Sequence, residues 1–480
     1  MLLRQTILYL PAQVVGPIFQ FISVVAWTHF LSPESMGVFA LITATQELAY
    51  TASLFWFTLY TMRYYNSANE EARRLFLDSE SAVIVISAIV SLMMVVALAM
   101  TVDAQWSLSL LASGIAYVLT RAVVTQFSDR ARTEHDTLTY SVLQMVWPVL
   151  GLAFGLMLVK LTEASTAAVL WGYTLAQILS IIIAMLRLDI GKNPFHASRD
   201  IIKAAVRYGL PLLAGGVFVW SANNGLRFIV EHYQGATAVG LVTVGWALGL
   251  RAANFAAMLV TAAAFPIAVK RAREGSMADG QHQLERNGVL LLVALLPAAI
   301  GLWLVTRPFV TLVVAEPYRE MTIAVLPMAI LAGTLRNLRI HFGEQVFLLR
   351  EQTMVPLYND IVDALVSLAG AAIGLWYGGL VGSVAGTAIG ALVSLLVTLG
   401  CGWHWHRFTL PLRDVLKVVV AAAIMGAVVS RLEIAPTVLS IGLATAVGAA
   451  IYAMVLAAFY PQETRAAVRL VLRQSAERGA

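Results

Sequence analysis

Six arginines lie inside long apolar runs of the sequence, where an ionisable side chain is unexpected. They are Arg121, Arg227, Arg251, Arg307, Arg336 and Arg339. A charged residue at the centre of a membrane helix costs about 2.5–3.5 kcal/mol on insertion scales, so such residues face partners or cavities. The planar guanidinium donates paired hydrogen bonds to phosphate oxygens. The pattern indicates either a basic anion site or structural ion pairs inside an apolar fold.

Depth within the runs separates these arginines into two groups. Arg227 and Arg307 lie near expected outer helix ends, where a long side chain can reach the lipid headgroups. Arg121, Arg251, Arg336 and Arg339 lie deeper. Since Arg336 and Arg339 are three residues apart, they share one face of a helix.

The elements that carry these residues are membrane-spanning helices. The chain has 480 residues, of which 59% are hydrophobic and 12% charged, with a mean hydropathy of +0.79. Soluble chains carry about 25% charged residues, so a soluble enzyme or nucleic-acid binder is excluded. About 20 apolar residues cross the hydrocarbon core as a helix. We expect an all-α polytopic protein with fourteen spans: 9–30, 37–60, 81–101, 107–127, 139–160, 166–187, 208–230, 237–262, 288–312, 322–345, 356–376, 380–402, 414–433 and 437–459.

Lysine and arginine set the predicted orientation. With the N-terminus inside, the cytoplasmic loops hold 23 of the 32 Lys and Arg residues, whereas the outer loops hold three. Cytoplasmic loops of membrane proteins are enriched in these residues, which also accounts for the net charge of +5. Both termini are therefore predicted to be cytoplasmic. Arg465, Arg469 and Arg473 predict a basic amphipathic tail helix, either a membrane anchor or a partner-binding segment.

A weak internal repeat relates the two halves of the chain. Tyr9-Leu10-Pro11 corresponds to Tyr208-Gly209-Leu210-Pro211, and Met36-Gly37-Val38-Phe39 corresponds to Val239-Gly240-Leu241-Val242. Such repeats are typical of transporters. We predict two six-helix lobes with pseudo-two-fold symmetry, 1–195 and 196–403, followed by two extra helices and the tail in 404–480. The repeat also maps Glu47 next to Arg251, so these two residues are expected to meet between the lobes.

Three motifs carry a resemblance to a known family. They are Tyr9-Leu10-Pro11-Ala12, the stretch from Leu31 to Leu41 and Arg63-Tyr64-Tyr65. The chain resembles the Wzx-like oligosaccharide flippases of the multidrug/oligosaccharidyl-lipid/polysaccharide exporter superfamily. Members often place an acidic residue before the Arg-aromatic pair near the end of span 7. This chain has Asn223-Asn224-Gly225-Leu226-Arg227-Phe228 there, with no acid.

The resemblance implies movement of undecaprenyl-pyrophosphate-linked oligosaccharide from the cytoplasmic to the periplasmic leaflet of the bacterial inner membrane. The sugars would enter O-antigen, capsule or exopolysaccharide. Membrane lipids, a glycan polymerase and chain-length machinery are the implied partners, and nucleic acid is not. Arg251, Arg336, Arg339 and Arg121, with Glu47, would form the cationic cleft for the pyrophosphate. Arg63, at a cytoplasmic helix end, would receive the headgroup.

Acidic residues offer a second kind of site. Asp360 and Asp363 in the eleventh span are candidate ligands for a coupling cation, with a solvated or capping role as the alternative. Glu344 is a further candidate, or else the partner of Arg336 or Arg339 in a structural pair.

No cofactor, metal site or enzymatic activity is expected. The histidines have no metal-ligand spacing, and the chain has no GxxxxGK[ST] loop for ATP. A cation-coupled exporter of small molecules is the alternative function. A membrane-embedded glycan polymerase or ligase is disfavoured by the short outer loops.

Overall fold

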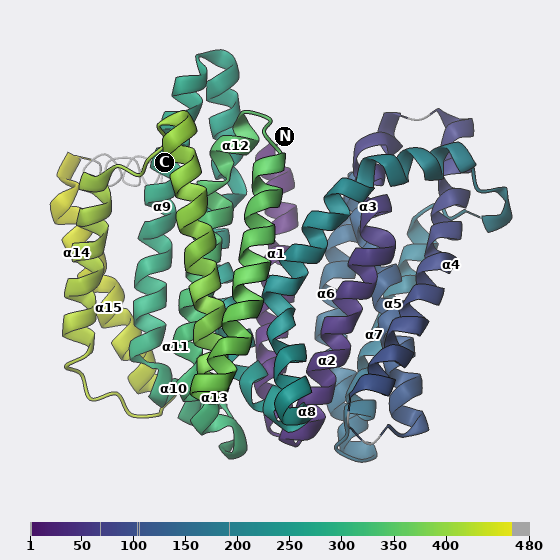
Figure 1. The fold of residues 1–480 in the computed structure, drawn as a ribbon, viewed down its shortest axis with the longest axis horizontal. Coiled ribbons are helices and arrows are strands. Elements are labelled where there is room, and N and C mark those ends of the chain that lie inside the picture. The colour runs from purple at the N-terminus through teal and green to yellow at the C-terminus, as the bar shows by residue number, and fades with distance from the viewer. Residues whose placement is uncertain (1, 68, 103, 105, 192, 463–480) are drawn as a thin grey trace, which may run out of the picture. The chain divides into compact units, whose positions relative to one another are not determined.

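The computed structural model describes residues 2–67, 69–102, 104, 106–191 and 193–462. Within these ranges the chain forms helices and no strands (Figure 1). The longer helices are α1 (Leu2–Thr28), α2 (Pro33–Tyr50), α3 (Trp56–Tyr64), α4 (Glu70–Thr101), α5 (Leu108–Thr133), α6 (Thr137–Leu161), α7 (Thr166–Arg187), α8 (Arg199–Glu274), α9 (Met277–Leu304), α10 (Thr306–Val313), α11 (Glu316–Leu338), α12 (Gln345–Leu349), α13 (Met354–His406), α14 (Leu412–Val429) and α15 (Val438–Phe459). The tail residues Arg465, Arg469 and Arg473 lie outside the described residues.

The helices confirm the predicted all-α polytopic membrane fold. Ten of the described helical segments are long and apolar enough to span a membrane. Two of these are interrupted, α8 at Gly235 and α13 at Gly378 and Gly379. Each interruption falls between two predicted spans. The apolar segment Val14–Thr28 of α1 and the 18-residue α14 supply the remaining predicted spans.

The interruption in α13 is the tight turn predicted at Trp376-Tyr377-Gly378-Gly379. Gly379 has a φ of 59°, in the left-handed region that a residue with a Cβ atom avoids. The two helical arms then pack with almost no space between their backbones. A Cβ atom on Gly374 would lie 2.0 Å from the carbonyl oxygen of Gly382. Gly382, Gly386 and Gly390 therefore line a contact at which the two arms pack closely.

Several helix ends differ from the predicted spans. Helix α4 begins at Glu70 rather than near 81, and α9 begins at Met277 rather than near 288. Asn69 and Ser276 cap these two helices through hydrogen bonds to backbone N–H groups. Hydropathy marks only the part of a helix that crosses hydrocarbon, whereas a capped helix continues through polar residues. The predicted span 288–312 is also divided into α9 and α10 at Val305.

Two helices contain π-helical turns, which hydropathy could not predict. Residues Thr51–Phe55 form one such turn between α2 and α3, and Arg339–Gly343 form another between α11 and α12. A π-helix bonds residue i to residue i+5, and such turns are frequent at functional sites. Both turns lie beside charged or polar side chains that are buried.

The chain divides into two compact units. Unit 1 comprises residues up to Leu248 together with Val314–Val325 and Leu357–Gly390. Unit 2 comprises Gly249–Val313, Leu326–Pro356 and the chain from Ala391 onward. Both units have apolar cores. Phe57 and Phe76 pack together in unit 1, and Phe342 packs against Phe408 in unit 2. The proposed lobe boundaries at 195 and 403 remain a prediction.

A reciprocal contact inside unit 1 links the two copies of the repeat. A Cβ atom on Gly37 would lie 1.8 Å from the carbonyl oxygen of Ala236, and one on Gly240 would lie 1.8 Å from that of Pro33. Gly37 and Gly240 are equivalent positions of the repeat. Each copy of the repeat thus makes the same contact with the other copy, and such a reciprocal contact indicates a two-fold relation between them. The contact therefore supports the repeat read from the sequence.

Candidate functional site

Arg63 ends α3 in unit 1 as an exposed cation held between aromatic rings. Its guanidinium carbon lies 5.3 Å from the centre of the Tyr208 ring and 5.6 Å from that of Tyr64. Its Nη1 also donates to the Tyr208 hydroxyl at 3.4 Å. These contacts fix the planar group while leaving it accessible. The geometry is compatible with the predicted capture of a headgroup.

Arg121 lies deeper in unit 1, on α5. Its guanidinium carbon is 3.8 Å from the centre of the Trp147 ring on α6, a cation–π contact. The charges of Asp129 and Glu47 also act on it. The predicted intramembrane cation therefore has an aromatic partner and acidic neighbours within its own unit.

Glu47, on α2, forms a hydrogen bond to the stretch 223–228, which lacks the acidic residue that members of the resembling family often carry there. Its Oε2 accepts a 3.0 Å hydrogen bond from Nδ2 of Asn224 on α8. The Glu47 charge also acts on Arg227. Glu47 thus places a carboxylate beside Asn224 and Arg227, although the stretch 223–228 carries none.

Arg227 was expected to reach the headgroups. Instead, Nη1 of Arg227 donates to the carbonyl oxygen of Ala40 on α2 at 3.3 Å. The prediction overlooked that a carbonyl of a neighbouring helix can serve an intramembrane arginine. Arg307, by contrast, is exposed on α10, as expected.

Arg336 and Arg339 lie in unit 2, where both are buried with 5% and 2% of their surface exposed. Nη1 of Arg339 lies 2.5 Å from Oε1 of Glu344, a buried ion pair. The π-turn explains why these residues meet. It places residues five apart in register, and the Glu344 N–H bonds the Arg339 carbonyl at 2.9 Å. Glu344 therefore forms the structural ion pair that was one of its two predicted roles, and its partner is Arg339.

Arg251 belongs to unit 2 and Glu47 to unit 1. Their pairing therefore stays a prediction. Arg251 is half-buried on α8.

Asp360 and Asp363 lie on α13 within unit 1. Asp363 is 1% exposed, and its Oδ1 accepts a 2.9 Å hydrogen bond from the Ser367 hydroxyl. Asp360 lies beside Gly215 of α8. The solvated alternative is wrong for Asp363, because neighbouring helices cover this turn of α13. A buried carboxylate beside a hydroxyl oxygen is suited to a hard cation.

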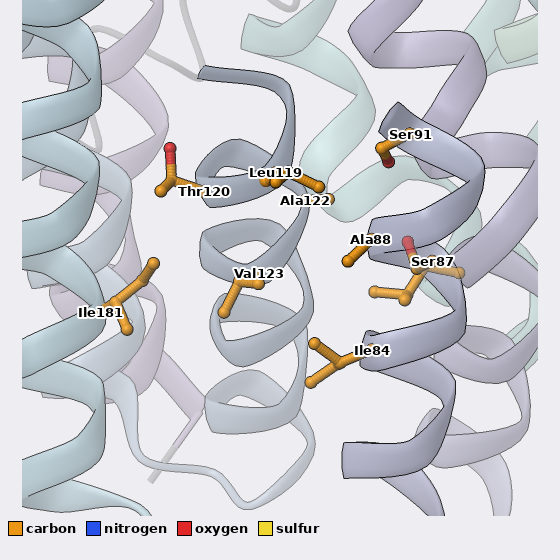
Figure 2. A pocket seen from close by; sticks show the side chains of 10 residues that line it. Ile84, Ser87, Ala88, Ser91, Leu119, Thr120, Ala122, Val123 and Ile181 are labelled. Atoms are coloured by element: carbon orange, nitrogen blue, oxygen red, sulfur yellow. The ribbon is translucent and has the colours of Figure 1, made fainter. Parts of the chain in front are cut away.

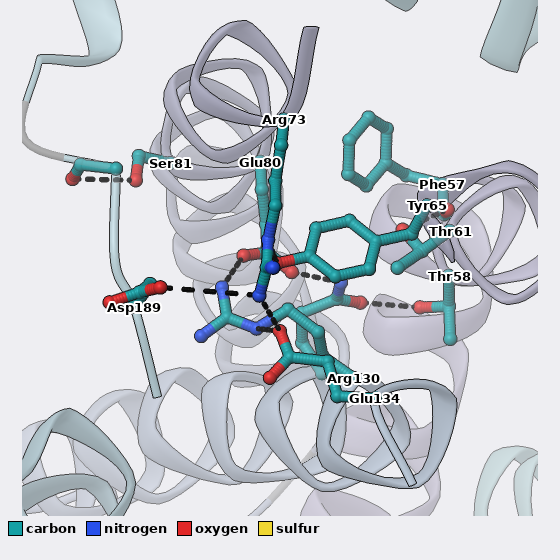
Figure 3. Close-up of polar contacts among 12 residues, drawn as sticks. Phe57, Thr58, Thr61, Tyr65, Arg73, Glu80, Ser81, Arg130, Glu134 and Asp189 are labelled. Atoms are coloured by element: carbon teal, nitrogen blue, oxygen red, sulfur yellow. Dashed lines mark hydrogen bonds and ion pairs between the residues drawn. The ribbon is translucent and has the colours of Figure 1, made fainter. Parts of the chain in front are cut away.

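A buried polar network in unit 1 was missed by the sequence analysis (Figure 3). Arg130 on α5 and Glu80 on α4 form an ion pair, and their side chains are 0% and 2% exposed. Both residues lie outside the predicted spans 81–101 and 107–127, in segments that the sequence assigns to cytoplasmic loops. The structure corrects this assignment. Each charge is buried because the other compensates it.

The network continues from this ion pair into the π-turn region. Gln126 Nε2 donates to Glu80 at 2.7 Å, and its Oε1 accepts from the Thr58 hydroxyl at 2.5 Å. Tyr50 lies 3.0 Å from Thr58 and donates to Asp129 at 3.1 Å. Helices α2, α3, α4 and α5 are thereby tied together by side chains. The network holds α2, which carries Glu47, and α3, which carries Arg63.

A small crevice in unit 1 lies between α4, α5 and α7 (Figure 2). Its volume is about 120 Å³, and most of its lining is apolar, including Ile84, Val123 and Ile181. Such a lining favours hydrocarbon over a charged group. Within the described residues, no group of three or more His, Cys, Asp or Glu residues could hold a metal ion.

The predicted site residues thus fall into two sets. Glu47, Arg63, Arg121, Asp360 and Asp363 belong to unit 1, and Arg251, Arg336, Arg339 and Glu344 belong to unit 2. Within unit 2, Arg339 and Glu344 are in contact. Within unit 1, the Glu47 charge acts on Arg121.

Long apolar helices with buried charged pairs define a polytopic membrane protein. Residues 2–271 match the model of the polysaccharide biosynthesis protein family. The chain belongs to this family, and its resemblance to Wzx-like flippases is confirmed. No curated protein matches the chain.

Solved structures confirm the fold. The lipid II flippase MurJ in an inward closed conformation has a TM-score of 0.77 at 14% identity, with 95% of this chain and 100% of MurJ covered. An inward-facing multidrug resistance transporter of the MATE family has a TM-score of 0.54 at 16% identity, covering 86% and 98%. A Pyrococcus furiosus transporter of the same superfamily, described as having a binding pocket of reverse polarity, has a TM-score of 0.55 at 15% identity, covering 87% and 95%. These solved structures are of a flippase and of transporters.

Proposed function

We propose that this protein is a flippase for undecaprenyl-pyrophosphate-linked oligosaccharide, moving it from the cytoplasmic to the periplasmic leaflet of the bacterial inner membrane by alternating access. The sugars would serve O-antigen, capsule or exopolysaccharide synthesis. Membership of the polysaccharide biosynthesis family together with arginines buried in apolar helices carries this proposal. The glycan polymerase and chain-length machinery are proposed downstream partners.

The proposed anion site consists of Arg121, Arg251, Arg336 and Arg339 with Glu47, and Arg63 receives the headgroup. Arg336 is buried where water cannot screen it, which strengthens its attraction for a phosphate. Arg339 can contribute only if the pyrophosphate competes with Glu344 for its guanidinium.

The membrane potential can supply the driving force. It is negative inside, and moving one charge gives about 2.3 kcal/mol per 100 mV. A headgroup with about two negative charges would gain about 7 kcal/mol on moving outward at about 150 mV. Both termini are proposed to be cytoplasmic, which orients the basic end of unit 1 toward the side of loading.

Coupling to a cation is a second possible drive, for which Asp360, Asp363 and Glu344 are the proposed residues. Asp363 is the best placed, because it is buried beside the Ser367 hydroxyl. Glu344 is engaged by Arg339. The MATE-like fold keeps a cation-coupled exporter of small molecules as the alternative function.

The test uses the full chain in liposomes that contain undecaprenyl-pyrophosphate oligosaccharide. The fraction of headgroups that reach the opposite leaflet is measured with and without an imposed potential. Crossing by the wild type, lost in Arg336→Ala and Arg251→Ala, is expected. Arg431→Ala, which changes an exposed arginine in the connection between α14 and α15, is the matched control. Absence of crossing under either a potential or a cation gradient would refute the proposal and favour the exporter.

A further inference from the structure

A large hollow with a mixed polar and apolar lining lies at one end of unit 1, apart from the residues discussed above. Its volume is about 1160 Å³. Small-molecule sites measure about 300–1,000 Å³, so the hollow has room for more than one ring. The walls come from the beginnings of α2, α5 and α7, the end of α6 and the segments that connect these helices.

The position of the hollow places it on the predicted outer face. Part of its lining, from Glu34 and Ser35, Ala104, and Thr162 to Ser165, belongs to the predicted outer loops 31–36, 102–106 and 161–165. Arg63, Arg73 and Arg187 lie at the opposite ends of their helices. Among the described residues that line the hollow there is no Lys or Arg, which matches the scarcity of basic residues in outer loops.

The lining offers hydrogen-bond acceptors and donors side by side. The carboxylates of Glu34 and Glu163 are exposed, and neither forms an ion pair within the described residues. Ser107 and Ser165 accept bonds from the backbone N–H groups of Leu110 and Ala168 as helix caps. A hydroxyl used as an acceptor still has its proton to donate. Such a mixture complements groups that are themselves donors and acceptors, as sugar hydroxyls are.

An aromatic platform completes the hollow. Trp171, on the second turn of α7, is half-buried in the lining. Its ring offers an apolar face beside polar neighbours, which suits the C–H face of a pyranose ring. Carboxylates, hydroxyls and an indole ring thus meet in one cavity.

Other ligand classes fit this lining less well. A pyrophosphate would be repelled by two carboxylates, because like charges at a binding surface are unfavourable. A hydrocarbon chain would cover the two carboxylates without offering them hydrogen-bond donors, which is costly. The described residues also lack a cluster that could hold a metal ion.

We propose that this hollow is an exit site that binds neutral or amino sugar units of the oligosaccharide on the outer face of unit 1. This inference rests on the proposed flippase function and adds a position for the sugars after the headgroup has crossed. Glu34 and Glu163 accept hydrogen bonds from sugar hydroxyls, and Trp171 stacks on a ring. Sugars with carboxylate groups are disfavoured at this position.

The experiment titrates the full chain in nanodiscs with a soluble probe. The probe is the fluorescently labelled, lipid-free oligosaccharide released by mild acid from the prenyl-linked intermediate of the producing cells. Fluorescence anisotropy gives the dissociation constant. Glu163→Gln and Trp171→Ala should each weaken binding about tenfold, which corresponds to one strong hydrogen bond or a comparable contact. Trp171→Phe keeps an aromatic face and should retain most of the affinity.

Trp376→Ala and Glu71→Gln are matched controls, since both residues are exposed and lie outside the hollow. Inorganic pyrophosphate should not compete with the probe. Thermal unfolding of each variant, measured in parallel, separates a loss of binding from a loss of folding. Equal binding by wild type and hollow variants, absence of binding, or competition by pyrophosphate would overturn the exit site. Binding of trilysine in place of the oligosaccharide would overturn it as well, since the hollow would then be a site for a cationic peptide.

The transport assay on the same variants distinguishes the two proposals. If the wild type moves the lipid while the hollow variants bind the probe unchanged, the exit site is refuted and the flippase function stands. If the wild type moves no lipid, the flippase function is refuted and the exit site falls with it.

Discussion

Removal of Glu80 should destabilise the protein strongly, because it leaves a buried cation without its partner. Arg130 is 0% exposed, and its Nε and Nη2 atoms have no hydrogen-bond partner within the described residues. Nη1 depends on Glu80, while Glu134 lies 3.7 Å from Nε. Glu80→Ala also deprives Gln126 of its acceptor. Removing one partner of a buried pair costs about 3–5 kcal/mol, and we expect a loss in this range.

The matched control is Glu274→Ala. Glu274 pairs with Lys270 at 3.8 Å, but their side chains are 68% and 71% exposed. Such surface pairs contribute about 0–1 kcal/mol. Reversible unfolding in mixed micelles, followed by tryptophan fluorescence, gives both free energies of unfolding.

The double variant Glu80→Leu with Arg130→Met tests the physical cause. Replacing both charges with apolar groups of similar size is often neutral, so much of the stability should return. A loss below about 1 kcal/mol in Glu80→Ala, or a double variant less stable than the single one, would contradict the reasoning from an uncompensated buried charge.

Three further predictions concern packing and transport. Gly374→Ala should prevent stable folding because its Cβ would lie 2.0 Å from a backbone oxygen, whereas Gly442→Ala, with no atom within 4 Å of its added Cβ, should unfold at or slightly above the wild-type temperature; size-exclusion profiles after heating compare them. Glu47→Arg and Arg251→Glu should each abolish lipid crossing, and the double reversal should restore it; a double variant as inactive as the singles would argue against their pairing. Asp363→Asn should remove any dependence of crossing on a cation gradient while leaving the response to potential, and an unchanged cation dependence would exclude Asp363 as the coupling residue.

Much of the fold could be predicted because hydrocarbon imposes a simple rule on sequence. A span needs a minimum length of apolar residues, and the turn at Gly378-Gly379 falls between two predicted spans. Helix ends beyond the hydrocarbon could not be placed in this way, since polar residues there are compatible with either helix or loop. Asn69 and Ser276 became informative only as caps.

The site was less predictable because pairing depends on tertiary contacts. Arg336 and Arg339 stood out as intramembrane charges, but the π-turn that selects Arg339 as the partner of Glu344 leaves no periodic signal. Arg130 and Glu80 were hidden for the opposite reason. Their positions near span ends matched a solvated loop, and only their mutual contact shows that they are buried.

Because of the π-turn at Thr51–Phe55, the contacts made by the residues beyond it depend on the exact number of residues in this helical segment. Each residue of an α-helix advances the chain by about 100°, so deleting one residue there would rotate everything that follows by roughly that angle. Thr58 would turn away from Gln126, and Arg63 would leave the ring of Tyr208. A one-residue deletion would thus alter two distant contacts while leaving the composition and hydropathy of the span nearly unchanged.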